Sequence, residues 1–133
     1  MSQQQVLIVD DEADIRELLE ITINRMGLAT HTAADIKSAH RLLQTQGFHL
    51  CLTDMRLPDG NGIDLVKTIA QQHPALPVAV ITAHGSIEAA IESLKAGAFD
   101  FLSKPIELNQ LRTIINGALG LEAKQSTPLY QDY

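Results

Sequence analysis

The sequence predicts a single α/β domain with five parallel strands in one sheet and helices on both of its faces. Five short apolar runs, each typical of a strand, alternate strictly with five helical stripes. Parallel neighbours need crossover connections of this kind, and such crossovers are right-handed. The length of 133 residues, with 45% apolar and 20% charged side chains, also fits one domain that can bury a core.

The first half of the chain supplies three of the strands and two of the helices. We expect strands at 6–9, 28–32 and 48–53, and helices at 13–26 and 36–43. Gly27 stops the first helix and the second closes near Gly47. The second strand is predicted at an edge, because Thr30 and His31 interrupt its apolar run. The third strand leads directly to Asp54.

The second half repeats the alternation after a loop rich in turn residues at 57–62. We expect helices at 63–70, 86–96 and 108–119, and strands at 77–81 and 99–102. Periodicity is lost near the end of the chain, where polar residues and Pro128 gather. We therefore predict a domain over residues 1–120, followed at 121–133 by a tail or the start of a linker.

Composition excludes several classes of function. The formal net charge of -6 and a pI near 5.2 argue against a nucleic acid or an anionic membrane as partner. The single Cys51 excludes an intrachain disulfide, and the five histidines lack zinc-ligand spacing. No signal peptide or membrane span is visible, which predicts a reducing, cytoplasmic setting.

Polar residues follow four of the five predicted strands. Asp10 and Asp11 come after the first, Asp54 after the third, Thr82 after the fourth and Lys104 after the fifth. In a doubly wound sheet, ligands bind beyond these carboxyl ends, near the point where strand order reverses. We therefore expect three carboxylates, a hydroxyl and an amine at one shallow site.

These side chains suit phosphoryl chemistry with a hard cation. Three neighbouring carboxylates repel one another unless a cation joins them, and oxygen ligands alone select Mg²⁺. Asp54 is the predicted nucleophile that forms an acyl phosphate. Taken singly, each residue has a simpler explanation: a helix N-cap for Asp10 or Asp11, a turn former for Asp54, a strand-end hydroxyl for Thr82 and a solvated amine for Lys104. Their joint placement favours the site.

The chain resembles the receiver domains of two-component response regulators over about residues 5–120. The motifs that carry the resemblance are Val9-Asp10-Asp11-Glu12, Thr53-Asp54-Met55-Arg56-Leu57-Pro58-Asp59-Gly60, Ile81-Thr82-Ala83 and Phe101-Leu102-Ser103-Lys104-Pro105. Within this family, residues 51–64 and 95–105 are most similar to the nitrogen-regulatory class of sigma-54-dependent activators, particularly regulators of type IV pili. The resemblance implies a flavodoxin-like (βα)5 fold with strand order 2-1-3-4-5.

The resemblance also implies a role for each residue at the site. Asp54 would accept a phosphoryl group from a sensor histidine kinase. Mg²⁺ would be bound by Asp11, Asp54 and the backbone carbonyl of Arg56, with Asp10 acting through water. Lys104, in a cis bond to Pro105, would pair with the phosphate, and Thr82 and the Ala83 backbone would contact it. Phe101 would fill the space that Thr82 leaves.

Three further residues, Phe101, Arg56 and His84, refine this expectation. Many receivers carry Tyr where this chain has Phe101, whose two positions would be separated by packing alone, so a static core ring is the alternative. Arg56 and His84 each lie two residues beyond a site residue, Asp54 and Thr82 respectively, at positions that set how fast water attacks the acyl phosphate in relatives. Two bulky groups there predict that water is screened.

The predicted function is a phosphoacceptor switch that acts on transcription and is not an enzyme acting on other substrates. Phosphorylation would bias the face made by the fourth helix, the fifth strand and the last helix, and would favour a homodimer. Output AAA+ and DNA-binding domains would lie elsewhere, since no P-loop or helix-turn-helix occurs here. The alternatives are a stand-alone receiver and an interaction module that is never phosphorylated.

Two other protein classes fit the sequence less well. A haloacid-dehalogenase-like phosphatase places its nucleophile after the first strand, with a second Asp two residues later. Here Asp10 and Asp11 are adjacent and Asp54 follows another strand. A flavodoxin-like electron carrier needs a hydroxyl-rich loop after the first strand, where this chain would repel a flavin phosphate.

Overall fold

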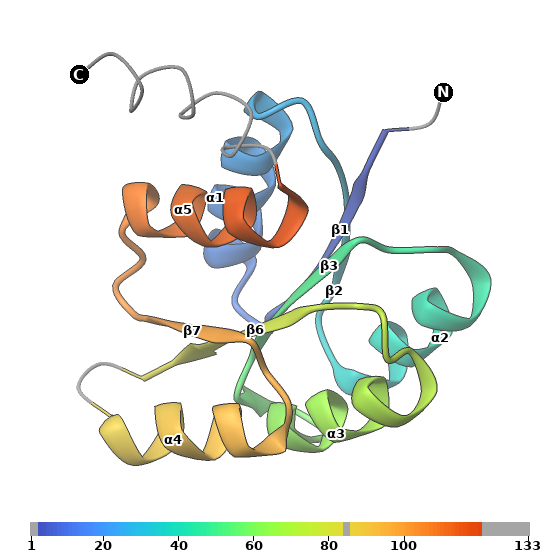
Figure 1. Ribbon diagram of the computed structural model, residues 1–133, viewed down its shortest axis with the longest axis vertical. Coiled ribbons are helices and arrows are strands. Elements are labelled where there is room, and N and C mark those ends of the chain that lie inside the picture. Colours follow the sequence, from blue (N-terminus) through green and yellow to red (C-terminus); the bar gives the residue numbers. More distant parts are fainter. Residues whose placement is uncertain (1–2, 84–85, 121–133) are drawn as a thin grey trace.

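The computed structural model describes residues 3–83 and 86–120, which form one α/β domain (Figure 1). Its strands are β1 (Gln5–Val9), β2 (Ala29–Ala33), β3 (Leu50–Asp54), β4 (Arg56–Leu57), β5 (Gly60–Asn61), β6 (Val78–Thr82) and β7 (Asp100–Ser103). Its helices are α1 (Ala13–Arg25), α2 (Ile36–Thr45), α3 (Gly62–Gln72), α4 (Ile87–Ala96) and α5 (Leu108–Leu119). All ten elements predicted from the sequence are present, with ends that differ by a few residues.

The main sheet is parallel throughout, in the order β2-β1-β3-β6-β7. Counted along the chain by main-sheet strands alone, this is the predicted order 2-1-3-4-5. Strand β2 lies at an edge, as its interrupted apolar run predicted, and β7 forms the other edge. The strand order reverses between β1 and β3, so the carboxyl ends of these two strands flank the expected binding crevice.

Both faces of the sheet are covered. Helices α1 and α5 lie on one side, and α2, α3 and α4 lie on the other (Figure 1). Along β1, Val6 and Ile8 pack into the core beneath α1 and α5, whereas Leu7 and Val9 pack into the opposite core. This alternation explains why the central strands are continuous apolar runs, because every side chain is buried on one face or the other.

The segment after Asp54 differs from the predicted turn-rich loop. It folds into a small antiparallel hairpin, β4–β5, in which Arg56 pairs with Asn61 and Leu57 with Gly60. Gly60 has a φ of 156°, which favours glycine. The hairpin is two residues deep on each side, too short to give a periodic pattern in the sequence.

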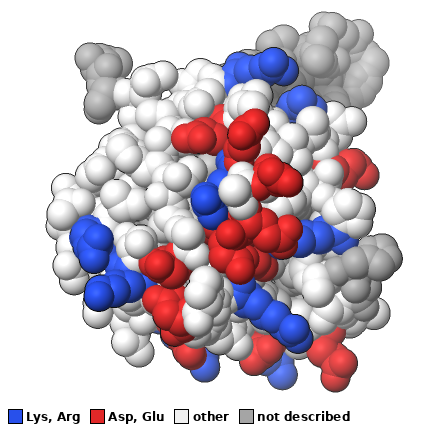
Figure 2. All heavy atoms as spheres, turned by 180° about the vertical axis from the view of Figure 1, so that it is seen from behind, with Lys and Arg blue, Asp and Glu red and all other residues white. Residues whose placement is uncertain are grey.

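The described surface agrees with the acidic composition. Figure 2 shows a face on which acidic side chains gather in a central patch, with Lys and Arg side chains dispersed around it. No continuous basic surface that would suit nucleic acid is visible on this face among the residues drawn. None of the helices in the described ranges is long and apolar enough to cross a bilayer. The predicted tail at 121–133 lies outside the described residues.

Candidate functional site

The site begins where two central strands end side by side. Asp10 directly follows β1, and Asp54 is the last residue of β3. The two strands are paired in register, with Val9 beside Thr53, so their next residues are neighbours. Both aspartates are buried, and Asp11 next to them is exposed. The predicted meeting of the three carboxylates is confirmed, because oxygens of Asp10, Asp11, Glu12 and Asp54 lie within 4.8 Å of one another.

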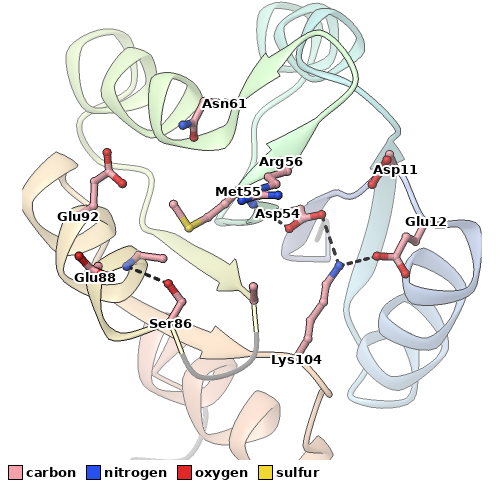
Figure 3. A pocket seen from close by; sticks show the side chains of 12 residues that line it. Asp11, Glu12, Asp54, Met55, Arg56, Asn61, Ser86, Glu88, Glu92 and Lys104 are labelled. Carbon is pink, nitrogen blue, oxygen red and sulfur yellow. Dashed lines mark hydrogen bonds and ion pairs between the residues drawn. The ribbon is translucent and has the colours of Figure 1, made fainter.

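Lys104 enters this acidic cluster from the end of β7. Its ammonium nitrogen lies 2.8 Å from Oε1 of Glu12, 3.4 Å from Oδ2 of Asp54 and 3.5 Å from Oδ2 of Asp10. In Figure 3 the Lys104 side chain extends between Asp54 and Glu12, and dashed lines join it to both. The peptide bond from Lys104 to Pro105 is cis, as predicted. Lys104 is therefore part of the site and is not a solvated surface amine.

The two buried carboxyls are held where ionisation is unfavourable. Burial raises the pKa of the Asp10 carboxyl, and the nearby Asp54 adds to the shift, although the backbone N–H of Glu12 opposes it. Burial also raises the pKa of Asp54. In that case Lys104 and the backbone N–H of Met55, which donates to Oδ1 at 2.8 Å, oppose the shift. Positive charge at this site therefore stabilises the ionised forms of both groups.

Lys104 itself is held in its charged form. Its partial burial favours the neutral amine, but the hydrogen bond to Glu12 and the carboxylates of Asp10 and Asp54 outweigh burial. The net effect raises the pKa of the Lys104 amine above its ordinary value. The site therefore keeps one permanent cation beside Asp54 over the whole physiological pH range.

The donor set fits a divalent cation with a preference for oxygen. Oδ2 of Asp10 is buried and has no hydrogen-bond partner among the described residues, although it lies 3.5 Å from the Lys104 nitrogen. An orphaned carboxylate oxygen inside an acidic cluster is costly unless a cation or an ordered water satisfies it. Carboxylate oxygens without imidazole or thiolate suit Mg²⁺. Asp11, Glu12 and Asp54 line the open side of the cluster, where a metal ion could enter.

Thr82 and Ala83 differ in their exposure to solvent, although they are adjacent at the end of β6. The Thr82 side chain is fully buried, and its hydroxyl lies 3.3 Å from the hydroxyl of Ser103 on the neighbouring strand. The Lys104 backbone N–H donates to the Thr82 carbonyl at 2.9 Å, which ties the ends of β6 and β7 together. Ala83 is exposed and lines the cleft beside Asp54. The Thr82 hydroxyl is therefore paired with Ser103.

Phe101 is not a fully buried core ring. It is half-buried on the edge strand β7 and lines an apolar groove of about 230 Å³ against α4. The other lining residues are Ser86, Ile87, Ala90, Ile91, Leu94 and Ser103. Ser86 lines both this groove and the cleft beside Asp54, so the two share a wall, and Ser103 of the groove also contacts the Thr82 hydroxyl.

The acidic cluster opens into a cleft of about 690 Å³ (Figure 3). Its lining residues are Asp11, Glu12, Asp54, Met55, Arg56, Asn61, Ala83, Ser86, Glu88, Ala89, Glu92 and Lys104. Arg56 is exposed and lines this cleft, and its role in screening Asp54 from water stays a prediction. His84, the other predicted screening residue, lies outside the described residues.

Three acidic residues of the cleft were not among the predicted site residues. Glu12 binds Lys104 directly, and its position next to Asp11 was a signal for this. Glu88 and Glu92 project from α4 across the cleft from Asp11 and Glu12 (Figure 3). Their i, i+4 spacing on the helix after the fourth main-sheet strand places them on one face.

A close backbone approach fixes the position of Asp54 relative to α3. The N–H of Gly62 donates to the Met55 carbonyl at 2.6 Å. A Cβ on Gly62 would overlap the Asp54 carbonyl oxygen, so the start of α3 can lie this close only with glycine there. Asn61 caps the helix, since its Oδ1 accepts the N–H of Ile63 at 2.8 Å. The start of α3 is thereby held directly against the backbone of Asp54 and Met55.

Comparisons with known proteins agree with this geometry. The family described as "Response regulator receiver domain" matches residues 6–116. The chain is 61% identical over 121 residues to the response regulator protein PilR of Pseudomonas aeruginosa, which covers 91% of this chain and 27% of PilR. It is 34% identical over 128 residues to the DNA-binding transcriptional regulator NtrC of Proteus hauseri, which covers 96% of this chain and 27% of NtrC.

Solved structures share the fold as well. The solution structure of the beryllofluoride-activated NtrC4 receiver domain dimer superposes with a TM-score of 0.81 at 32% identity, covering 86% of this chain and 94% of that one. The curated relatives are much longer than this chain, which spans about a quarter of their length, 27% for both PilR and NtrC.

Proposed function

The chain belongs to the response regulator receiver domain family, and on that premise we propose that Asp54 accepts a phosphoryl group from a sensor histidine kinase. The observation that carries the proposal is the position of the Asp54 carboxylate at the end of β3. It is mostly buried, with Oδ2 facing the Lys104 ammonium and the cleft. The similarity to PilR and NtrC confirms the predicted nitrogen-regulatory class and the resemblance to pilus regulators.

In the proposed step, an Asp54 carboxylate oxygen forms a bond to phosphorus while the P–N bond of the kinase phosphohistidine breaks. The electron pair of that bond stays on the imidazole, and Asp54 becomes an acyl phosphate. Phosphoryl transfer of this kind depends mainly on positioning and on neutralising the equatorial oxygens. Lys104 supplies one fixed positive charge for this purpose.

Mg²⁺ is the proposed cofactor, and it would neutralise negative charge on both the carboxylates and the phosphoryl group. Asp11, Asp54 and the backbone carbonyl of Arg56 would hold it, and Asp10 would act through water. The orphaned Oδ2 of Asp10 supports this role, because a metal-bound water can donate to it.

The proposed switch starts at Thr82. A phosphoryl group on Asp54 offers new acceptor oxygens, for which Thr82 would exchange its contact with Ser103, and Ala83 would offer its backbone N–H. Phe101, already half-buried beside Ser103, would follow into the space that Thr82 leaves. The α4 face would then adopt a second packing.

The proposed partner of that face is a second copy of this chain. Three apolar side chains of α4 are unusually open: Ile87 is 74%, Ile91 48% and Leu94 44% exposed. They line the groove that also contains Phe101. A related receiver has been solved as an activated dimer, so we assign this face to a dimer that forms on phosphorylation.

Transcriptional output belongs to segments outside this chain. The longer curated relatives leave room for AAA+ and DNA-binding domains, and we propose that phosphorylation of this receiver controls such domains in the full protein. Residues 1–120 are the proposed receiver, and 121–133 are the proposed tail or start of a linker. The cytoplasm is the proposed location, as for a domain that meets the kinase there.

The test is the intact mass of the protein after incubation with Mg²⁺ and acetyl phosphate. One added phosphoryl group is expected, absent from Asp54→Asn and from a sample that contains EDTA. A short sampling time and a candidate kinase as a second donor exclude rapid hydrolysis or donor mismatch. Unchanged mass under all of these conditions would instead identify an interaction module that is never phosphorylated.

A further inference from the structure

A carboxylate outside the acidic cluster joins the loop of the site to a distant helix. Asp59, at the turn of the β4–β5 hairpin, accepts two backbone N–H groups at the start of α2. Its Oδ1 accepts from Ile36 at 2.8 Å and its Oδ2 from Lys37 at 3.0 Å. These partners are 23 and 22 residues away in the chain. Asp59 therefore fixes the hairpin to α2, a helix that contributes no residue to the acidic cluster or to the lining of the cleft.

This contact is separate from the normal cap of α2. Asp35 is the N-cap residue, and its Oδ1 accepts the N–H of Ser38 at 2.7 Å. The first N–H groups of a helix have no partners within the helix, and a negative charge there is favoured by the helix dipole. Asp59 satisfies two of these groups with charge-assisted hydrogen bonds, which are stronger than neutral ones.

The neighbouring Gly60 shows how closely the hairpin approaches α2. A Cβ on Gly60 would lie 2.8 Å from Cδ1 of Ile36, closer than real contacts of this kind. Gly60 also has a positive φ of 156°. The turn thus lies close to the Ile36 side chain, and two hydrogen bonds join it to Ile36 and Lys37, the first two residues of α2.

The hairpin needs such an external anchor. It contains two residue pairs, Arg56 with Asn61 and Leu57 with Gly60, and an isolated two-stranded hairpin is marginal even when longer. Arg56 lies at one end of it, two residues after Asp54, and its side chain is exposed. Leu57, which is buried, and Asn61, which caps α3, hold the base of the hairpin, whereas Asp59 holds its turn against α2.

We propose that Asp59 is a positioning residue for the metal site: by anchoring the hairpin to α2, it holds the Arg56 backbone beside Asp54. This inference rests on the proposed function, in which the Arg56 carbonyl is a metal ligand. Groups that orient ligands from outside the coordination shell matter for metal affinity. The exposed Asp59 contributes no core packing, so its replacement leaves the two apolar cores intact.

The test compares three variants of the chain with the wild-type protein. Asp59→Ala removes both contacts to α2, and Asp59→Asn keeps one acceptor oxygen. Asp35→Ala is the matched control, because it removes an acceptor from the same helix end without touching the hairpin. Direct Mg²⁺ titration by calorimetry is the first readout, and urea denaturation records how much stability each variant loses.

We expect Asp59→Ala to weaken Mg²⁺ binding roughly tenfold, at the low end of what loss of an outer support costs a metal site. Asp59→Asn should lie between Asp59→Ala and the wild-type protein. Asp35→Ala should bind Mg²⁺ as the wild-type protein does, even where its loss of stability is as large. The inference is overturned if Asp59→Ala binds Mg²⁺ as tightly as the wild-type protein. It is also overturned if Asp59→Ala and Asp35→Ala lose Mg²⁺ affinity equally.

Amide hydrogen exchange gives a second readout that a purely structural role would not change. Coupling between two sites is reciprocal, so Mg²⁺ must strengthen the contact that strengthens Mg²⁺ binding. Exchange of the Ile36 and Lys37 amides should slow when Mg²⁺ is added to the wild-type protein and to Asp35→Ala, but not to Asp59→Ala. Unchanged exchange of these amides in a wild-type protein that binds Mg²⁺ contradicts the role of Asp59, whereas a wild-type protein that binds no Mg²⁺ contradicts the proposed function itself.

Discussion

The ammonium nitrogen of Lys104 lies 3.4 Å from Oδ2 of Asp54, although the two residues are 50 positions apart in the chain. The same nitrogen is bonded to Glu12 and lies 3.5 Å from Asp10, so one cation serves three carboxylates. Lys104 is therefore the internal counterion of the site before any metal or phosphate arrives.

Replacing Lys104 by Ala should destabilise the protein at neutral pH without Mg²⁺ by about 1–3 kcal/mol, since two buried carboxylates lose their counterion. The raised pKa of Lys104 means that its contribution is present below the ordinary amine pKa and is lost as pH rises through the higher folded value. The destabilisation caused by Lys104→Ala should be smaller at acidic pH, because the carboxyl groups that Lys104 neutralises are protonated there. Urea denaturation at pH 7 and pH 4 measures it.

The exposed Lys67 on α3 provides the control for this experiment. Lys67→Ala removes the same charge and should change stability by less than about 0.5 kcal/mol at either pH. If Lys104→Ala costs no more than Lys67→Ala at pH 7, the ion pairs of Lys104 do not stabilise the site.

Asp54→Asn should have the opposite effect on stability in the absence of Mg²⁺. The pKa of Asp54 is raised in the folded protein, so the unfolded chain ionises first as pH rises. Stability is therefore lost between the ordinary value of 3.8 and the raised folded value, and the loss persists at pH 7. The variant, which cannot ionise there, should be more stable than the wild-type protein at pH 7, with the difference shrinking toward pH 3.

Added Mg²⁺ should reverse that ranking. A ligand at about 100 times its dissociation constant stabilises the folded state by about 2.7 kcal/mol, and only the wild-type protein retains the Asp54 ligand. Thermal melts with and without Mg²⁺ at pH 7 show the crossover. If the wild-type protein is already more stable than Asp54→Asn without Mg²⁺, the ionised Asp54 carboxylate does not destabilise the folded protein.

Gly62→Ala should disturb the site through the backbone alone. The added Cβ would overlap the Asp54 carbonyl oxygen, so α3 or the end of β3 has to move, at a cost of about 1–3 kcal/mol. Gly117→Ala is the matched control, since that helical position has open space and should gain about 0.5 kcal/mol. Chemical denaturation separates the two variants, and a Gly62→Ala protein as stable as the wild type would refute the close approach.

Ile91→Ser should weaken the proposed dimer of phosphorylated protein. Ile91 is 48% exposed in the groove face of α4, and its loss removes apolar contact area there. Ile21→Ser is the control, because Ile21 is 45% exposed but lies on α1. Sedimentation of acetyl-phosphate-treated samples should show a dimer dissociation constant about tenfold higher for Ile91→Ser only. An equal effect of both substitutions would place the dimer face elsewhere.

The sequence predicted the sheet and most of the site because both depend on local patterns. Continuous apolar runs mark the covered strands, and the residues Asp10, Asp54 and Lys104 lie at the ends of three of them, so parallel topology alone brings them to one edge. The direction of a side chain is not encoded in this way. The Thr82 hydroxyl lies against Ser103, and Glu12 reaches Lys104, only because particular rotamers fit the packed ends of neighbouring strands.

Features made by two distant loops were equally hard to predict. The β4–β5 hairpin has strands of two residues, which are too short for any periodicity, and its anchor on α2 joins segments more than 20 residues apart. Glu88 and Glu92 are exposed on α4 and also line the cleft that contains Asp54, although nothing in the sequence of that helix marks them as site residues. Such placement depends on how the helices pack and not on the pattern of any one element.

These two glutamates should select against small anionic phosphodonors. Five carboxylates and two basic groups line the cleft, so its field opposes a dianion such as acetyl phosphate. The double variant Glu88→Gln, Glu92→Gln should react with acetyl phosphate about threefold faster at low ionic strength. The gain should fade near 1 M salt, where the screening length is about 3 Å.

The control for this effect is the Glu17→Gln variant. Glu17 is an exposed residue of α1 outside the cleft, whereas Glu88 and Glu92 line it. Neutralising Glu17 changes the net charge by one unit in the same direction but leaves the cleft as it is. The rate of Asp54 phosphorylation, followed by intact mass over time, should therefore stay within about 1.5-fold of the wild-type rate at all salt concentrations, because exposed charges beyond a screening length are largely silent. A similar acceleration in Glu17→Gln would assign the effect to overall charge and not to the two residues on α4.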